Sequence, residues 1–135
     1  MKTAVTLVSA LLVASVLTAT ALAHNFQRTT WIEGHKVPEG TTAPESPVVI
    51  WGKVHSGRSL CIRNRVVLLR RVATPGPDPI IERDVTDRQG EYLFVRRPTH
   101  DQRVYAKVKR LDATSTGHSH TCFASRTRNI LLDVQ

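Results

Sequence analysis

Between Asp84 and Val95, a short polar stretch separates two segments in which apolar and polar residues alternate. This pattern predicts two strands joined by a tight turn. Asp87 can accept a hydrogen bond from its own backbone two residues on, and Gly90 can adopt positive φ without a Cβ clash. After the turn, Tyr92 and Phe94 fall on one side of a strand and Leu93 on the other. We expect this hairpin or meander at the centre of a small all-β domain.

Short segments with the same alternation recur along the chain, and turn residues bound them. None shows a helical period. Six or seven short strands at roughly ten-residue spacing predict an antiparallel sandwich in one domain. The predicted strands cover residues 48–55, 61–72, 80–85, 92–96, 103–111, 121–124 and 129–134.

Residues 24–47 contain several prolines and glycines and no apolar period, so they predict a flexible N-terminal arm ahead of a domain at 48–135. Trp31-Ile32 is the apolar anchor of this arm, and it either docks on the domain or a partner or is incidental. Three prolines and a glycine predict a loop at 73–79. A composition rich in Thr, Ser, Gly and His predicts a mobile loop at 112–120.

The first 23 residues have the features of a secretory signal peptide: Lys2, an apolar run, and a closing Ala21-Leu22-Ala23. The alternative is an uncleaved membrane anchor. Cleavage after Ala23 leaves 112 residues, enough for one modest core. No later segment is apolar enough to span a membrane, so we expect a secreted, extracellular protein.

Two cysteines, Cys61 and Cys122, lie in the exported part. An even number of cysteines in an oxidising compartment indicates a disulfide. Two free buried thiols, or a pair of metal ligands, are the alternatives.

The charge is strongly positive: +8 for the chain, and +7 without Lys2. Such a field attracts polyanions, and arginine suits phosphate, sulfate and carboxylate groups. We expect an anionic cell-surface polymer or a secreted protein as partner; the alternative is a basic surface without a dedicated ligand. Aromatic residues are too few to stack single-stranded nucleic acid, so no specific nucleic acid is predicted. The candidate polyanion-binding residues are Arg63, Arg65, Arg70, Arg71, Arg103, Lys107, Lys109 and Arg110.

Three histidines are weaker candidates for metal binding. Cleavage would make His24 the N-terminal residue, and an N-terminal amine and imidazole can bind copper if His118 or His120 adds a ligand. His118-Ser119-His120 otherwise belongs to a solvated loop. Asp84 and Asp87 are too few for a calcium site, so we expect them to cap the turn. No cofactor and no catalytic residue is predicted.

Several of these segments together resemble the transthyretin-like, carboxypeptidase-regulatory-like β-sandwich domains, most closely the small secreted bacterial type with one cysteine pair. The resemblance covers Val48 to Gln135. It rests on Val54, Cys61, Val66–Leu69, Thr86–Tyr92, Val104–Val108, Cys122 and Asn129–Val134.

The resemblance implies a seven-stranded Greek-key sandwich of the prealbumin or immunoglobulin-like kind that is usually not an enzyme. Hydroxyisourate hydrolases of this architecture end in Tyr-Arg-Gly-Ser, whereas this chain ends in Leu132-Asp133-Val134-Gln135. Intradiol dioxygenases need two tyrosines and two histidines at matching positions, and Tyr92 and Tyr105 have no such histidine pair. We therefore expect a secreted, non-enzymatic binding module with a basic surface. The alternatives are a copper-binding redox protein that uses His24 and an accessory subunit of a secreted enzyme.

Overall fold

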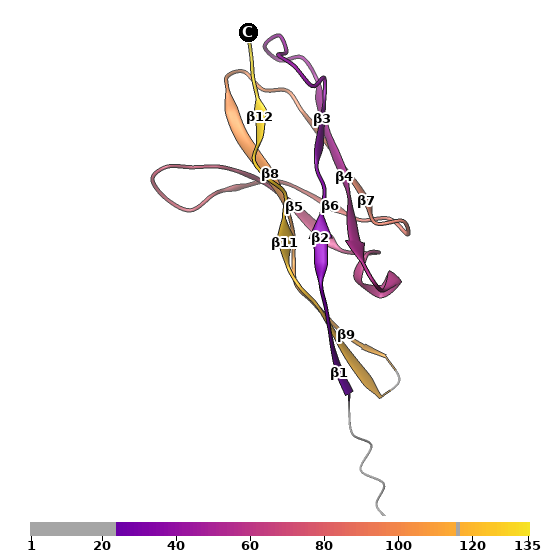
Figure 1. Cartoon of the computed structure of the whole chain (residues 1–135). Helices are drawn as coiled ribbons and strands as arrows, with labels where there is room; N and C mark the ends of the chain where they lie inside the picture. Colours follow the sequence, from indigo (N-terminus) through magenta and orange to yellow (C-terminus); the bar gives the residue numbers. More distant parts are fainter. Residues whose placement is uncertain (1–23, 116) are drawn as a thin grey trace, which may run out of the picture.

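The computed structural model describes residues 24–115 and 117–135, and this part of the chain is all-β (Figure 1). It contains twelve strands, a short 3-10 helix (η1) and no α-helix. The elements are β1 (His24–Arg28), β2 (Thr30–Ile32), β3 (His35–Val37), β4 (Val48–Ser56), η1 (Ser59–Cys61), β5 (Val66–Arg71), β6 (Ile80–Val85), β7 (Glu91–Arg96), β8 (Gln102–Val108), β9 (Leu111–Ser115), β10 (His118–Cys122), β11 (Ser125–Arg126) and β12 (Ile130–Leu132).

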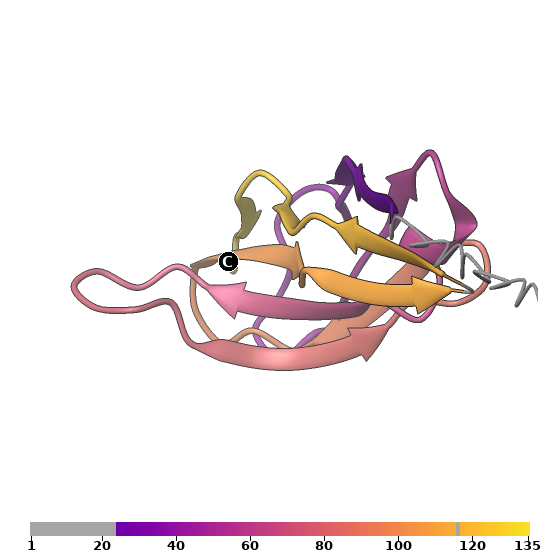
Figure 2. The ribbon, with the colours of Figure 1, turned by 90° about the horizontal axis from the view of Figure 1, so that it is seen from below.

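Two antiparallel sheets face each other across one core, as the all-β prediction requires. In one, β4 pairs with β7 on one side and with β2 and β3 on the other. In the second, β5 lies between β6 and β8, and β8 also pairs with β11 and β12. Figure 2 shows the layers from below, with the loop between β5 and β6 projecting from one end. Each of the two sheets therefore has one face on the core and one outer face.

Alternation along the strands builds the core, as the sequence predicts. Tyr92 and Phe94 of β7 are both buried, whereas Leu93 between them is exposed. Ile50 of β4 and Leu69 of β5 join the same cluster from facing sheets. Burying an aliphatic side chain of this size contributes roughly 1.5–3 kcal/mol. Residues on the outer faces are thereby left free to carry charge.

The turn between β6 and β7 has the predicted chemistry. Asp87 Oδ1 accepts hydrogen bonds from the backbone N–H groups of Gln89 and Glu91, both at 2.9 Å. Gly90 has φ of 87°, and a Cβ there would lie 2.6 Å from the carbonyl oxygen of Val54. Only glycine fits this position without displacing β4.

Asp84 protects the exposed edge of β7. Its Oδ2 accepts a hydrogen bond from the backbone N–H of Leu93 at 2.8 Å, and its Oδ1 accepts one from Val85 at 2.8 Å. An occupied edge N–H cannot pair with another chain. Asp84 and Asp87 thus cap backbone groups, the role that the sequence predicts for them.

The region expected to be a flexible arm, 24–47, instead contains β1, β2 and β3. β2 and β3 run against β4 in one continuous register, with Ile32 opposite Val54 and His35 opposite Trp51. Ile32 is buried in the core, so the predicted anchor does dock on the domain. The prediction of an unstructured arm failed because the edge of β4, far along the chain, supplies the backbone partners that the local sequence lacks.

The predicted loop at 112–120 is also regular structure. β9 and β10 form a hairpin, and β1 adds to β10 in parallel, which makes a third, three-stranded sheet. This sheet extends beyond the sandwich at the end opposite the C-terminus (Figure 1). Its residues are polar and β-branched, so the pattern of apolar residues carries little signal there.

The predicted disulfide is present and lies at the base of the third sheet. Cys61 in η1 and Cys122 at the end of β10 are both buried, with a Cα–Cα distance of 5.4 Å. The bridge joins the third sheet to the turn that precedes β5, 61 residues away in sequence. The described residues contain no free cysteine, so the free-thiol and metal-pair alternatives do not hold.

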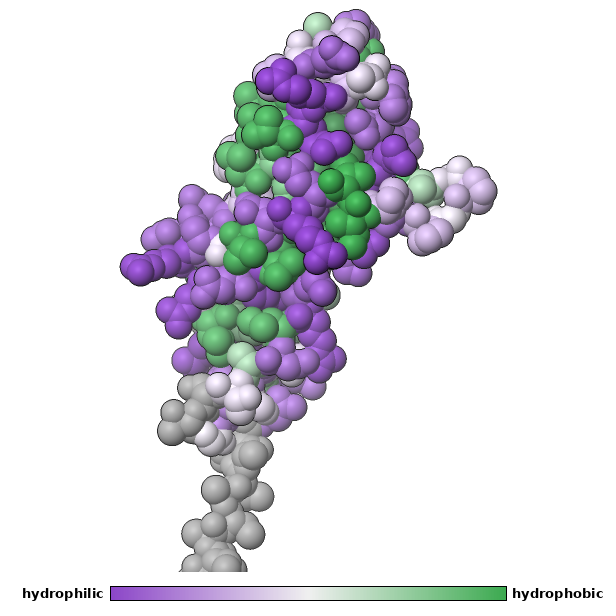
Figure 3. Space-filling view, turned by 180° about the vertical axis from the view of Figure 1, so that it is seen from behind, coloured by the Kyte–Doolittle hydropathy of each residue, from purple (hydrophilic) through white to green (hydrophobic). Residues whose placement is uncertain are grey.

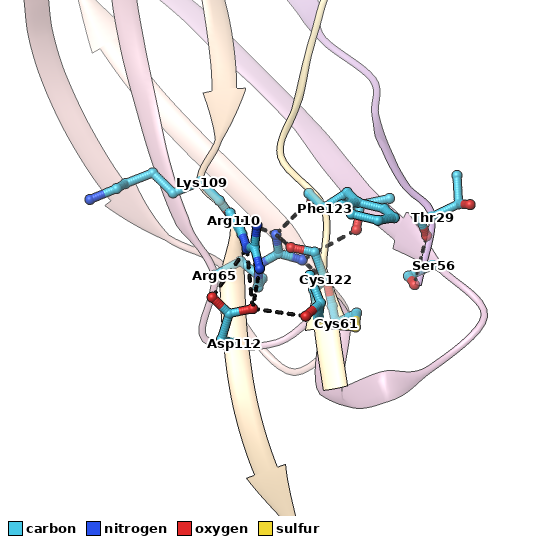
Figure 4. Close-up of a disulfide and its surroundings, with 11 residues drawn as sticks. Thr29, Ser56, Cys61, Arg65, Lys109, Arg110, Asp112, Cys122 and Phe123 are labelled. Atoms are coloured by element: carbon cyan, nitrogen blue, oxygen red, sulfur yellow. Dashed lines mark hydrogen bonds and ion pairs between the residues drawn. A yellow bond between two sulfur atoms is a disulfide. The ribbon is translucent and has the colours of Figure 1, made fainter. Parts of the chain in front are cut away.

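Beside the disulfide, the Arg65 guanidinium is buried at 1% exposure and binds backbone carbonyls from several segments (Figure 4). Nη1 donates to the carbonyl oxygen of Cys61 at 2.5 Å. Nη2 donates to those of Lys109 at 2.5 Å and Phe123 at 3.1 Å. Burial lowers the pKa of Arg65 from its usual value. One side chain thus ties η1, the end of β8 and the end of β10 together.

The predicted signal peptide, residues 1–23, lies outside the described residues. Within the described residues, no helix is long and apolar enough to cross a membrane.

Replacing Arg65 by methionine should destabilise the fold by roughly 3 kcal/mol or more, because buried carbonyls lose their charged donor. Chemical denaturation of the oxidised protein measures this loss. The exposed Arg63, two residues away, provides the matched control: Arg63→Met should change the free energy of unfolding by no more than about 0.5 kcal/mol. Equal stabilities for the two variants would contradict the role assigned to Arg65.

Reducing the Cys61–Cys122 disulfide should lower the free energy of unfolding by about 4 kcal/mol, as expected for a loop of this length. Denaturation with and without reductant measures the difference. The double variant Cys61→Ala/Cys122→Ala should unfold like the reduced protein and show no response to reductant. A wild-type denaturation midpoint that does not move under reducing conditions would rule out this contribution.

Candidate functional site

Positive side chains from four strands share the outer face of the sheet that contains β5. Lys107 of β8 pairs with Arg126 of β11 and with Leu68 of β5, and Leu68 pairs with Arg83 of β6. Residues in register project to the same face of a sheet. Since Val67 and Leu69 point into the core, this row of side chains points outward.

Arg70 and Arg103 extend this row. Arg70 pairs with Tyr105, which lies two residues from both Arg103 and Lys107 and so shares their face. Leu68 in the middle of the face is only 4% exposed, as expected where long basic side chains surround an apolar residue. We refer to Arg70, Arg83, Arg103, Lys107 and Arg126 as the basic face.

Tyr105 and Asp78 hold two of these arginines in place. The guanidinium of Arg126 lies 3.5 Å from the centre of the Tyr105 ring, a cation–π contact. The Tyr105 hydroxyl donates to Asp78 Oδ2 at 2.9 Å, and Arg70 donates to the Asp78 backbone carbonyl at 2.8 Å. Hydrogen bonds from the Ala73 backbone N–H and the Tyr105 hydroxyl lower the pKa of Asp78. The loop between β5 and β6 therefore supports the basic face.

A hollow of about 640 Å³ adjoins the face where β8 begins. Arg71 and Arg103 line it together with His100 and Gln102. Asp101 also lines it, but its Oδ1 already accepts a hydrogen bond from the Val134 backbone N–H at 2.8 Å. Two guanidinium groups around one hollow suit an anionic group.

The structure separates the eight candidate residues into three groups. Arg70, Arg103 and Lys107 lie on the basic face, and Arg71 joins Arg103 at the hollow. Arg63, Lys109 and Arg110 lie in connections outside these strands. Arg65 is buried, so its choice as a polyanion contact was wrong: nearby carbonyl oxygens occupy its guanidinium.

Arg110, another of the candidates, forms a solvent-exposed ion pair with Asp112. Its Nε and Nη2 lie 3.0–3.1 Å from the Asp112 carboxylate. Hydrogen bonds from Arg110 and the Thr121 hydroxyl lower the pKa of Asp112. Sequence analysis did not select Arg83 and Arg126 as candidates, although the alternation in 80–85 places Arg83 on the other side of the strand from its neighbours Glu82 and Asp84 and could have indicated it.

The opposite outer face, on the sheet of β4, is aromatic. Trp31 stacks on His55 with ring centroids 3.7 Å apart, and His35 stacks on Trp51 at 4.6 Å. Glu33 lies between these pairs, with its carboxylate 3.2 Å from His55 Nε2 and 3.9 Å from His35 Nε2. Sequence analysis missed this cluster because half of it comes from the region predicted to be an arm. Figure 3 shows the molecule from behind, and on this side hydrophobic residues form separate patches among hydrophilic ones.

The candidate metal-binding histidines lie in the third sheet. The backbone of His24 is in register with that of His118, and Phe26 is in register with His120. The Phe26 ring stacks on His120 at 5.3 Å and contacts His118 at 5.7 Å. Among the residues searched within the described part of the chain, no group of three or more His, Cys, Asp or Glu side chains is placed to hold a metal ion.

No protein-family model and no curated protein matches this chain. The transthyretin-like resemblance therefore stays a prediction, and the functional argument rests on the geometry above.

Tyr92, which is buried beneath the aromatic face, should make the free energy of unfolding depend on pH in the alkaline range. Burial and the nearby Glu33 carboxylate raise the pKa of Tyr92 above its usual value. Unfolded tyrosine loses its proton near pH 10, while folded Tyr92 keeps it. The unfolded state then binds fewer protons, so the free energy of unfolding falls as pH rises above about 10.

The variant Tyr92→Phe should not show this part of the alkaline decline in the free energy of unfolding. At neutral pH it should be less stable by about 1 kcal/mol, because the Tyr92 hydroxyl donates to the Glu33 carbonyl oxygen at 2.7 Å. Urea denaturation at a series of alkaline pH values measures both effects. Tyr105→Phe is the comparison, since the pKa of Tyr105 is also raised, by burial and by Asp78. The slope of the free energy of unfolding against pH should change less for Tyr105→Phe than for Tyr92→Phe. A slope that Tyr92→Phe leaves unchanged would contradict the role assigned to Tyr92.

Proposed function

We propose that this chain is an exported, non-enzymatic binding module that recognises anionic polymers through its basic face. The observation that carries this proposal is the row of Arg126, Lys107 and Arg83 across β11, β8 and β6, in which Leu68 of β5 lies between Lys107 and Arg83; Arg70 and Arg103 lie beside this row. Strands in a sheet lie about 4.8 Å apart. Arg126 and Lys107 are thus one strand spacing apart and Lys107 and Arg83 two. Several charges in such a row match the repeated anions of a phosphate, sulfate or carboxylate polymer better than a single small anion.

The weak local compensation of this charge supports the same function. Among the ion pairs between described residues, none involves Arg83, Arg103 or Lys107. Asp78, whose carboxylate interacts electrostatically with Arg126 and Arg70, is held by hydrogen bonds from the Ala73 backbone N–H and the Tyr105 hydroxyl. The uncompensated charges of this face attract anions. A polyanion is favoured over small anions because its binding releases the small counterions.

A prealbumin-like Greek key is the fold that we propose for this module. β2 and β3 share one register on β4, and β11 and β12 both lie along β8. Counting each interrupted pair as one strand gives seven strands in the two facing sheets. The disulfide supports an oxidising compartment outside the cytoplasm, in agreement with the signal peptide expected at 1–23.

Copper binding through His24 is a second candidate, favoured by one observation. β1 lies parallel to β10, which brings the backbones of His24 and His118 into register. The candidate requires that the mature chain begin at His24, and N-terminal sequencing of the exported protein decides this. No specific observation favours an accessory subunit of a secreted enzyme.

Binding to heparin and to polyphosphate tests the main proposal. The triple variant Arg83→Gln/Arg103→Gln/Lys107→Gln should weaken binding about tenfold, because each charge–anion contact at a surface contributes up to about 1 kcal/mol. The slope of log K against log salt should become shallower. Fluorescence anisotropy with a labelled polymer at several salt concentrations measures both.

The matched control is Arg58→Gln/Arg63→Gln/Arg88→Gln, which removes the same charge from exposed positions outside the strands of the basic face. It should leave most of the affinity in place. If both triple variants bind equally weakly, net charge alone explains the attraction and the proposed face is wrong.

A further inference from the structure

A second hollow, of about 440 Å³, lies where the ends of β6 and β7 meet β4. It is independent of the function proposed above. Trp51, Val85 and Leu93 form its apolar lining, and Asp84, Asp87 and Glu91 supply its acidic groups. Ligand pockets commonly combine an apolar lining with a few fixed polar groups.

The apolar lining is unusually accessible. Trp51 is 42% exposed, Val85 55% and Leu93 53%. The three come from β4, β6 and β7, so the core and the backbone hydrogen bonds of both sheets fix their positions. His35 stacks on the indole ring of Trp51, which holds the ring in one orientation. The lining is therefore built before any ligand arrives.

The acidic groups have unequal roles. Asp84 uses both carboxylate oxygens to accept backbone N–H groups, and Asp87 uses Oδ1 in the same way. The Glu91 carboxylate takes part in none of the side-chain hydrogen bonds or ion pairs found between described residues. Among the described residues, three carboxylates and no basic side chain line this hollow, on a chain with a net charge of +8. Lys53 of β4 is in register with Glu91 but is not part of the lining.

We propose that this hollow binds an aliphatic ammonium ion. The hydrocarbon part packs on Leu93, Val85 and the Trp51 ring, and the ammonium group pairs with Glu91 and Asp87. Charge complementarity selects this class: three carboxylates repel an anion, and a neutral occupant would desolvate them without compensation. The indole of Trp51 adds a cation–π attraction to an ammonium group near its face.

Three probes of equal chain length test the proposal: hexylammonium, hexanol and hexanoate. Trp31→Phe serves as the background, so that Trp51 is the fluorescent tryptophan among the described residues. Hexylammonium should quench or shift the emission saturably, and hexanol should bind roughly fivefold more weakly, the effect expected of one partly exposed ion pair. Hexanoate should not bind measurably. Added salt should weaken the binding of hexylammonium.

Glu91→Gln should reduce the affinity for hexylammonium roughly fivefold and bring it close to that for hexanol. Glu39→Gln, an exposed acid outside this hollow, is the matched control and should leave affinity unchanged. Circular dichroism and thermal unfolding of both variants should match the background protein, because no hydrogen bond to either carboxylate is broken.

Equal binding of hexanol and hexylammonium, or an unchanged affinity in Glu91→Gln, would overturn the proposal. So would a dimer in sedimentation velocity that Leu93→Asp dissociates, since a second copy would then cover the hollow. Saturable, salt-sensitive binding that depends on Glu91 and not on Glu39 would support it.

Discussion

The buried guanidinium of Arg65 holds together the parts of the molecule that the hydrophobic core does not reach. A charge at this depth is tolerated only when oxygen atoms surround it, and backbone carbonyls of Cys61, Lys109 and Phe123 do so here. The disulfide beside it restrains the same segments covalently. Together they join the third sheet to the sandwich, and they determine where β8 ends and the chain turns toward β9 (Figure 4).

Away from this point, the two-layer core determines where chemistry can occur. Each strand presents one face to the core, so its charged and aromatic residues gather on the two outer faces. On the sheet of β5 these are arginine and lysine, supported by Tyr105. On the sheet of β4 they are tryptophan, histidine and glutamate. The net positive charge of the chain conceals this division, because the acidic groups are concentrated where β6 and β7 meet.

The strands that were predicted well are those whose burial follows a local alternation. β4, β6 and β7 lie within one residue of their expected limits, β8 ends three residues before its expected limit, and the Asp87–Gly90 turn has its expected hydrogen bonds. β1, β2, β3 and β9 were missed because their sequences are short or largely polar, and because pairing with other strands stabilises them. Arg65 could not be distinguished from Arg63 either: both follow Cys61 in an arginine-rich segment, and only the folded chain decides which one is enclosed.

The sequence by itself determined the all-β class, the pairing of its two cysteines and the inward side of the main strands, since these follow from local periodicity and residue chemistry. Tertiary structure alone decided which basic residues share a face, which arginine is buried, and that a hollow with acidic groups forms beside Trp51. The reason is that register between strands distant in sequence sets these neighbours. Register depends on the packing of the whole core, which no single segment encodes.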